Sequence, residues 1–146
     1  MVMKTTAVKK PRVGLAVILM NNEKVLLGKR KNNPGVGEWS FPSKHLNLYE
    51  NFKPCVTRII NEETGLERRG VKLIDDYPVA VTNDLFLDND KHNVTLFMRA
   101  RYLLGDVRIM EEDKYERWLW FEWDELPNGL FLPVKNLINQ GYNPFA

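Results

Sequence analysis

The sequence predicts an α/β fold in which a mixed β-sheet lies between helices. Strand-like and helix-like segments follow one another in the order strands, one helix, strands, one helix, which favours a sheet between two helical layers. The 146 residues suffice for one domain with its own core. Hydrophobic residues make up 44% and charged residues 27%, as in ordinary globular proteins. We expect a single domain over residues 11–146, after a polar leader over residues 1–10.

The N-terminal segments predict a β-hairpin and a short third strand. Residues 13–20 form a nearly continuous apolar run, which is typical of a central strand covered on both faces. Residues 21–23 turn the chain, and residues 24–28 supply the second strand. A loop rich in Pro and Gly over residues 32–38 then leads to a short strand over residues 39–41.

The first helix is predicted from Asn51 to Gly65. Asn51 suits the N-cap, and Pro54 falls in the first turn, where its missing N–H costs little. Gly65 suits the left-handed residue that closes a helix. Glu62 and Glu63 occupy the last turn, at the negative end of the helix dipole, where neither propensity nor the dipole favours them. A bound cation would account for this pair of carboxylates.

The second half of the chain predicts more strands and one more helix. In order, we expect a strand over 71–81, a loop or exposed hairpin tip over 82–91, a strand over 93–104, a charged loop over 108–116, an aromatic-rich strand over 118–123 and an amphipathic helix over 131–140.

Composition excludes several classes of protein. The net charge of +2 is too small to indicate a surface for polymeric nucleic acid. The single cysteine, Cys55, excludes an intrachain disulfide, fits a reducing compartment, and lies where we expect a small core residue. No apolar run approaches the roughly 20 residues of a membrane span, and the N-terminus lacks the apolar core of a signal peptide. We therefore expect a cytoplasmic protein without a membrane partner.

The stretch from Lys44 to Leu66 resembles the Nudix box. The family pattern is Gly, five residues, Glu, seven residues, and then Arg-Glu-apolar-any-Glu-Glu-any-Gly-apolar. Two of its nine defined positions differ here, because Lys44 stands at the first Gly and Ile59 at the first Glu. The seven matching positions are Glu50, Arg58, Ile60, Glu62, Glu63, Gly65 and Leu66. A gapped match of this length is far more specific than a lone glycine motif.

The resemblance covers nearly the whole chain. Three short motifs precede the box in the same order as in the family, namely Leu-Leu-Gly-Lys-Arg, Gly-any-Trp and a Pro. The second half of the chain is similar to MutT-type enzymes that clear oxidised nucleotides. The resemblance implies the Nudix α-β-α sandwich with its mixed sheet. It also implies hydrolysis of a nucleoside diphosphate linked to another group, a small-molecule partner. Relatives are often homodimers, although no sequence feature marks an interface.

The same resemblance implies a magnesium site, with manganese as a substitute. Magnesium takes oxygen ligands and shares them with substrate phosphates. The implied catalytic residues are Arg58, which orients the glutamates, Glu62 and Glu63; the implied metal ligands are Glu63, Glu62, the backbone carbonyl of Lys44, and Glu111 or Glu112.

Five residues are candidates for substrate contact. Lys29 and Arg30 begin a basic cluster. It is either the solvated end of a strand or a site of contact with phosphate. His45 follows the opening of the box and resembles a common family residue there. Phe97 and Phe131 either pack in the core or stack on a nucleotide base.

Ile59 leaves three functions open, because an apolar side chain can neither bind a metal nor activate water. Loss of such a group commonly lowers the rate by about 100- to 10,000-fold. The chain is then an active diphosphate hydrolase, or a catalytically impaired module that binds a nucleotide or a protein. The third alternative is a GDP-sugar hydrolase that attacks the sugar carbon, since those relatives also carry an apolar residue after the Arg. Their catalytic loop position aligns with Asp113.

Overall fold

The structure, a computed structural model, describes residues 9–146. The predicted leader lies outside the described residues except for its last two. The strands are β1 (Arg12–Asn21), β2 (Lys24–Arg30), β3 (Trp39–Ser40), β4 (Ser43–His45), β5 (Val71–Leu73), β6 (Ala80–Phe86), β7 (Lys91–Tyr102) and β8 (Tyr115–Glu122); the helices are α1 (Phe52–Thr64) and α2 (Leu132–Asn139). In the part of the chain that the structure describes, no helix is long and apolar enough to cross a membrane.

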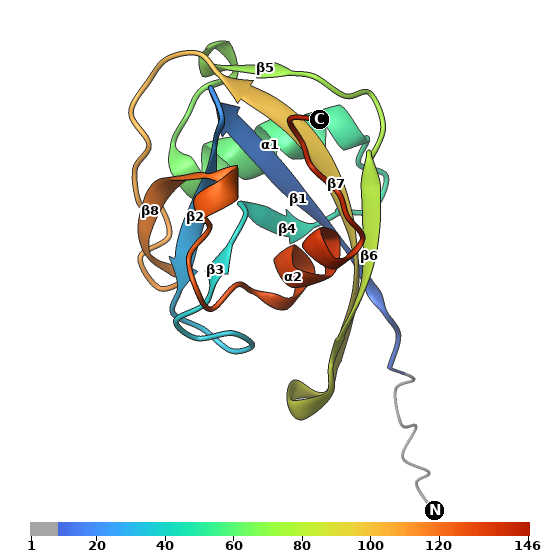
Figure 1. Cartoon of the computed structure of the whole chain (residues 1–146). Coiled ribbons are helices and arrows are strands. Elements are labelled where there is room, and N and C mark those ends of the chain that lie inside the picture. The colour runs from blue at the N-terminus through green and yellow to red at the C-terminus, as the bar shows by residue number, and fades with distance from the viewer. Residues whose placement is uncertain (1–8) are drawn as a thin grey trace, which may run out of the picture.

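Strand β1 is the centre of a mixed sheet. It runs parallel to β7, from the pair Arg12 and Asn93 to the pair Met20 and Arg101. Its other edge pairs antiparallel with β4 and then with β2. β3 and β8 extend the sheet from β2, while β5 and β6 pair with β7. Helices α1 and α2 lie on opposite faces of this sheet, so the predicted sandwich is confirmed (Figure 1).

The alternation of side chains along β1 divides the core in two. Leu15, Val17 and Leu19 pack toward α1. Ala16, Ile18 and Met20 pack toward α2. Each fully buried aliphatic side chain contributes about 1.5–3 kcal/mol. Both faces of β1 are therefore covered, as its continuous apolar sequence predicts.

The prediction for residues 71–91 is wrong in detail. Residues 71–81 form two strands, β5 and β6, separated by a turn that contains Pro78. The predicted loop is largely strand, because β6 continues to Phe86 and only residues 87–90 turn. Two of its polar residues, Thr82 and Asp84, are buried, and Asp84 accepts hydrogen bonds from Thr82 and from Thr95 of β7. Polar side chains that form hydrogen bonds with one another inside the protein made this stretch of sequence resemble a loop.

Helix α1 begins and ends where the sequence predicts. Asn51 precedes it in an extended conformation, but its side chain makes no capping hydrogen bond. Gly65 closes it in the left-handed region, with φ of 76°, and donates its N–H to the Asn61 carbonyl over 3.0 Å. Cys55 and Ile59 point into the core and are 0% exposed. Cys55 is thus the small core residue predicted.

We expect Ile59→Glu to destabilise the fold. The substitution restores the family residue but places a carboxylate among the apolar side chains between α1 and β1, which should lower the free energy of unfolding by about 3–5 kcal/mol. Urea unfolding measures this. Ile59→Val, the control, should lower it by only about 0.5–1.5 kcal/mol. An Ile59→Glu protein as stable as wild type would show that position 59 is open to solvent.

Candidate active site

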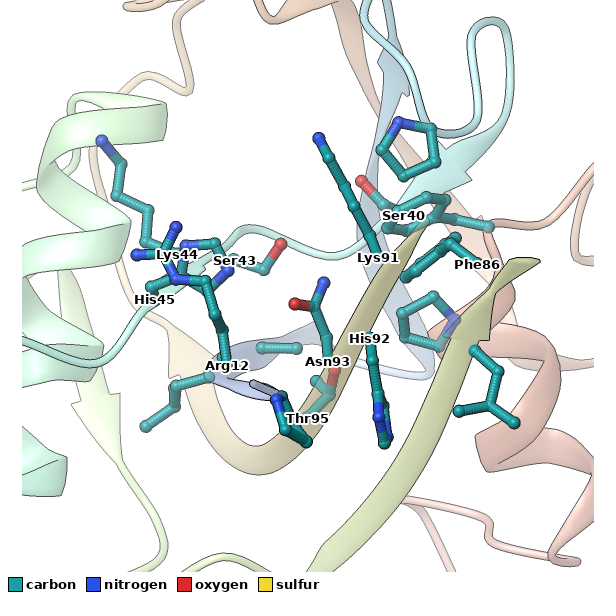
Figure 2. Close-up of a pocket in the computed structure, with 18 of the residues that line it drawn as sticks. Arg12, Ser40, Ser43, Lys44, His45, Phe86, Lys91, His92, Asn93 and Thr95 are labelled. Carbon is teal, nitrogen blue, oxygen red and sulfur yellow. The ribbon is translucent and has the colours of Figure 1, made fainter. Parts of the chain in front are cut away.

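A cationic cleft of about 960 Å³ opens beside β1, β4 and β7. Figure 2 shows Arg12, Lys44, His45, Lys91 and Asn93 gathered around it. Eight lysine and arginine residues line this cleft, namely Lys9, Lys10, Arg12, Arg30, Lys44, Arg58, Lys91 and Lys114. Among the lining residues the structure describes, Asp90 is the one acidic residue, and it pairs with Lys9. The cleft is therefore suited to an anion, although the whole chain carries only +2.

One wall of the cleft is aromatic. The rings of Phe86 and Phe131 stack with centroids 5.3 Å apart. The guanidinium of Arg30 lies 4.0 Å from the centroid of Phe131 and donates to the Pro34 carbonyl over 2.9 Å. Burial lowers the pKa of Arg30, against the pull of neighbouring acidic groups. Phe86 and Phe131 are each only 7% exposed, so they offer the cleft an apolar edge rather than a free ring face.

Glu63 lies behind the cleft wall and is 0% exposed. Its Oε1 accepts hydrogen bonds from the Ser43 N–H and the Tyr115 hydroxyl, both over 2.9 Å. Its Oε2 accepts one from the Lys114 ammonium, which also donates to the Ser43 carbonyl over 2.8 Å. Burial raises the pKa of Glu63, and these three contacts oppose the rise. Both carboxylate oxygens are therefore occupied by partners from three segments.

Lys44 joins the other two carboxylates of the site. Its Nζ lies 3.2 Å from Glu62 and 3.1 Å from Glu111. Burial acts to lower the pKa of Lys44, but the two carboxylates raise it overall. In the same way burial acts to raise the pKa of Glu62, but Lys44 and then Arg58 lower it. Glu111 keeps one buried oxygen, Oε1, without a hydrogen-bond partner among residues 9–146.

Arg58 ties α1 to the loop that precedes it. Its Nε and one terminal nitrogen donate to the two oxygens of Glu50 over 2.8 and 3.0 Å. It also donates to the His45 carbonyl over 3.0 Å and, more weakly, to Glu62 over 3.4 Å. The fork from Arg58 lowers the pKa of Glu50 to about 2. Arg58 is therefore held mainly by Glu50 and the His45 carbonyl, and its orienting role toward the other glutamates stays a prediction.

The structure brings together most of the predicted site residues. Arg58, Glu62, Lys44 and Glu111 form one chain of ion pairs. Glu63 pairs separately with Lys114, which also donates to the carbonyl of Ser43, the residue before Lys44. Arg30, His45 and Phe131 line the cleft. Burial lowers the pKa of His45, and the nearby Arg12 acts in the same direction, so both favour the neutral imidazole.

Three predicted residues lie elsewhere. Phe97 is 0% exposed and packs edge to face on Phe41, so it cannot stack on a base. Lys29 follows the strand alternation onto the face opposite Arg30 and pairs with Glu116 over 3.6 Å. Glu112 has an exposed side chain, and only its backbone carbonyl is used, by Lys31.

Sequence reasoning missed Lys114, Lys91 and Arg12. Lys114 belongs to a charged stretch that looked like an exposed loop. In the structure this stretch is a tight turn in which the N–H groups of Lys114 and Tyr115 donate to the Glu111 carbonyl. The sequence carries no local signal for Lys114, because its partner Glu63 lies 51 positions away.

The implied ligand set does not fit a divalent ion as it is arranged. Both oxygens of Glu63 already accept hydrogen bonds, and Glu62 and Glu111 share the ammonium of Lys44. Over residues 9–146, no three His, Cys, Asp or Glu side chains are grouped so as to hold a metal ion. Ile59, at the remaining ligand position of the family, is in the core.

Comparison with known proteins gives the class of this chain. The family model described as NUDIX domain matches residues 10–140, so the chain belongs to the Nudix family. An RNA pyrophosphohydrolase from Zymomonas mobilis is 26% identical over 146 aligned positions, covering 92% of this chain and 94% of that protein. An ADP-ribose pyrophosphatase from Methanocaldococcus jannaschii is 37% identical over 67 positions, covering 46% of this chain and 40% of that protein. By family, therefore, the chain is a hydrolase.

Solved structures agree with this assignment. A MutT NUDIX hydrolase from Burkholderia pseudomallei is 28% identical with a TM-score of 0.78, covering 92% of this chain and all of that one (100%). The NUDIX domain of Shewanella oneidensis NrtR, solved in complex with ADP ribose, is 19% identical with a TM-score of 0.67, covering 92% of this chain and 88% of that one. The second likeness shows the shared fold alone.

The ion pair between Arg58 and Glu50 should make the free energy of unfolding depend on pH in the acid range. The pKa of Glu50 lies below its ordinary value of 4.5, at about 2. Its contribution to stability is therefore present above pH 4.5 and is lost as the pH falls toward 2. Glu50→Gln should lower the free energy of unfolding by about 2 kcal/mol at pH 7 and leave it unchanged near pH 2.

Urea unfolding at both pH values tests this. Glu67→Gln is the matched control, because Glu67 pairs with Arg69 on the surface; it should change stability by less than about 0.5 kcal/mol at either pH. A Glu50→Gln deficit of equal size at both pH values would contradict the proposed pairing.

Proposed function

We propose that this Nudix hydrolase binds a nucleoside diphosphate linked to another group in the cationic cleft and cleaves its diphosphate. The observation that carries the proposal is the charge of the cleft, whose described lining holds eight cationic side chains and one acidic one. Phosphate oxygens are the anions that clustered Arg and Lys bind best. Cleavage is inferred from family membership and binding from the geometry.

The aromatic pair beside the cationic part of the cleft offers only a small apolar surface to a ligand. Phe131 and Phe86 stack on each other beside Arg30, and each is 7% exposed. Their exposed edges favour a ligand that carries an organic group beside its diphosphate. The neutral His45 adds a hydrogen-bonding group without adding charge.

We propose Arg58, Glu62 and Glu63 as the functional residues of the box. In this arrangement Glu63 contacts Ser43 and Lys114 at the cleft wall, and Arg58 holds the end of β4 at His45. Glu62 keeps the more accessible carboxylate and is the better candidate to handle a proton. The magnesium requirement implied by the resemblance stays a prediction, and the assays below test it. The cytoplasmic location and the homodimer also stay predictions.

A second function, a nucleotide-binding module with little turnover, has an observation of its own. Ile59 replaces an implied catalytic glutamate and is part of the core, so its environment cannot supply a base. Lys44 and Lys114 further engage the remaining carboxylates. The alternative of attack at a sugar carbon receives no such support, because the side chain of Asp113 is exposed and does not line the cleft.

Turnover and binding together separate the two functions. We would assay release of phosphate-containing products from ADP-ribose, other nucleoside diphosphate derivatives and a 5′-triphosphorylated oligonucleotide, each with EDTA, Mg²⁺ or Mn²⁺. The oligonucleotide is included because one relative is named an RNA pyrophosphohydrolase. Turnover that is lost in Glu62→Gln supports the hydrolase. Tight binding without turnover supports the binding module, and neither binding nor turnover contradicts both.

We expect Arg30→Met to weaken binding of the nucleotide by about 10-fold or more, since it removes one charged donor from the cleft. Lys29→Met is the matched control. It removes a neighbouring positive charge whose side chain lies on the other face of β2, so the Kd should stay within about twofold of wild type. Isothermal titration calorimetry measures both, and thermal unfolding checks that each variant is folded. Equal losses in the two variants would contradict the assigned faces.

A further inference from the structure

The ammonium of Lys114 is held between two oxygens at the wall of the cleft. It donates to the Ser43 carbonyl and to Oε2 of Glu63, and it lies 5.3 Å from the centroid of the Tyr115 ring. Its side chain is 24% exposed and lines the cleft. An ammonium has three N–H donors. Two are engaged by residues that the structure describes, so one is left for a ligand.

Lys44 is arranged in the same way one step along the wall. Its ammonium bridges Glu62 and Glu111, and its side chain is 22% exposed and also lines the cleft. Figure 2 shows Lys44 extending toward α1, the helix that carries Glu62. Each lysine is thus fixed by an oxygen pair and presents a positive charge to the cleft. A fixed charge binds an anion with less loss of side-chain entropy than a free lysine does.

The two ammonium groups match the charge of one divalent ion. Glu62, Glu63 and Glu111 supply three carboxylates, and the two lysines return two positive charges. Relative to the family pattern, the same site has lost a carboxylate at Ile59 and gained an ammonium at Lys44. A metal ion placed here would have to displace ammonium groups that are anchored to the chain, and their repulsion would offset much of its attraction to the three carboxylates.

We propose that Lys44 and Lys114 take the place of a divalent ion in this cleft, so that the chain binds a diphosphate without metal. The ligand class is a nucleoside diphosphate, whose negative oxygens accept the remaining N–H donors of the two lysines. The inference rests on the proposed function for the identity of the ligand. It goes beyond that function because it concerns the counterion and assigns it to two residues of this chain.

Two measurements on the wild-type protein test the proposal. Electron paramagnetic resonance of added Mn²⁺ reports metal bound to the protein alone, and calorimetry with ADP as the probe reports nucleotide binding in EDTA and in Mg²⁺. We expect Mn²⁺ to remain free at millimolar concentration. We expect the Kd for ADP to agree within about twofold between EDTA and Mg²⁺.

A double variant, Lys44→Gly with Lys114→Met, gives the complementary result. It should lose at least about 10-fold in ADP affinity in EDTA, and it should bind Mn²⁺, because the carboxylates are released. The matched control is Lys29→Met with Lys72→Met, which changes the net charge equally at residues that do not line the cleft. This control should behave as wild type in both measurements.

The outcomes separate this inference from the proposed function. Stoichiometric Mn²⁺ binding by wild type, or ADP binding that requires Mg²⁺, overturns the inference and leaves the proposed function standing. If no nucleotide binds under any condition, the proposed function fails, and the Mn²⁺ measurement alone decides between a site closed to metal and one that accepts it. Because the decisive measurements use the wild-type protein, the proposal survives or fails even if the double variant does not fold.

Discussion

The buried contact between Glu63 and Lys114 is the interaction on which the site depends. A fully buried carboxylate is tolerated only when its oxygens are satisfied, and Glu63 is satisfied by groups from β4, from the start of β8 and from the turn before it. The contact therefore joins the end of α1 to two separate parts of the sheet. It orients the ammonium of Lys114, whose backbone is already placed by the turn, against the wall that β4 forms at Ser43.

The proposed exclusion of a metal ion and the proposed binding of an anion both rest on the electrostatics of this arrangement. The carboxylates lie at the carbonyl end of α1, where the helix dipole adds negative potential, and the two lysines neutralise that end from the cleft side. At an effective dielectric constant of 20, a divalent ion about 4 Å from one ammonium is repelled by about 8 kcal/mol, and this repulsion offsets a comparable attraction to one of the neighbouring carboxylates. Arg12, Arg30 and Lys91 have no acidic neighbours among the other lining residues except Asp90, so the cleft keeps a positive excess.

The sequence predicted the arrangement of strands and helices and the residues of the Nudix box, but only part of the cleft. The covered strand β1, the closing Gly65 and the cluster of Arg58 with its glutamates follow from local patterns and a family match. Lys114 does not, because its partner Glu63 lies 51 positions away and is reached only when β8 folds against β2. Strand alternation separates Lys29 from Arg30, but no local pattern says which face of β2 carries the site. Phe97 was misassigned for the same reason.

The role of Glu63 changes what a match to the family pattern means in this chain. A glutamate at this position satisfies the pattern, yet here its charge is balanced and its oxygens are all engaged within the fold. Its presence is then explained by the packing of α1 on the sheet, independently of chemistry on a substrate. The accessible carboxylate is Glu62, and Glu111 holds a buried oxygen without a partner. Any group that takes a proton from water is therefore to be sought on the side of Lys44, where the charges are shared and a ligand can rearrange them.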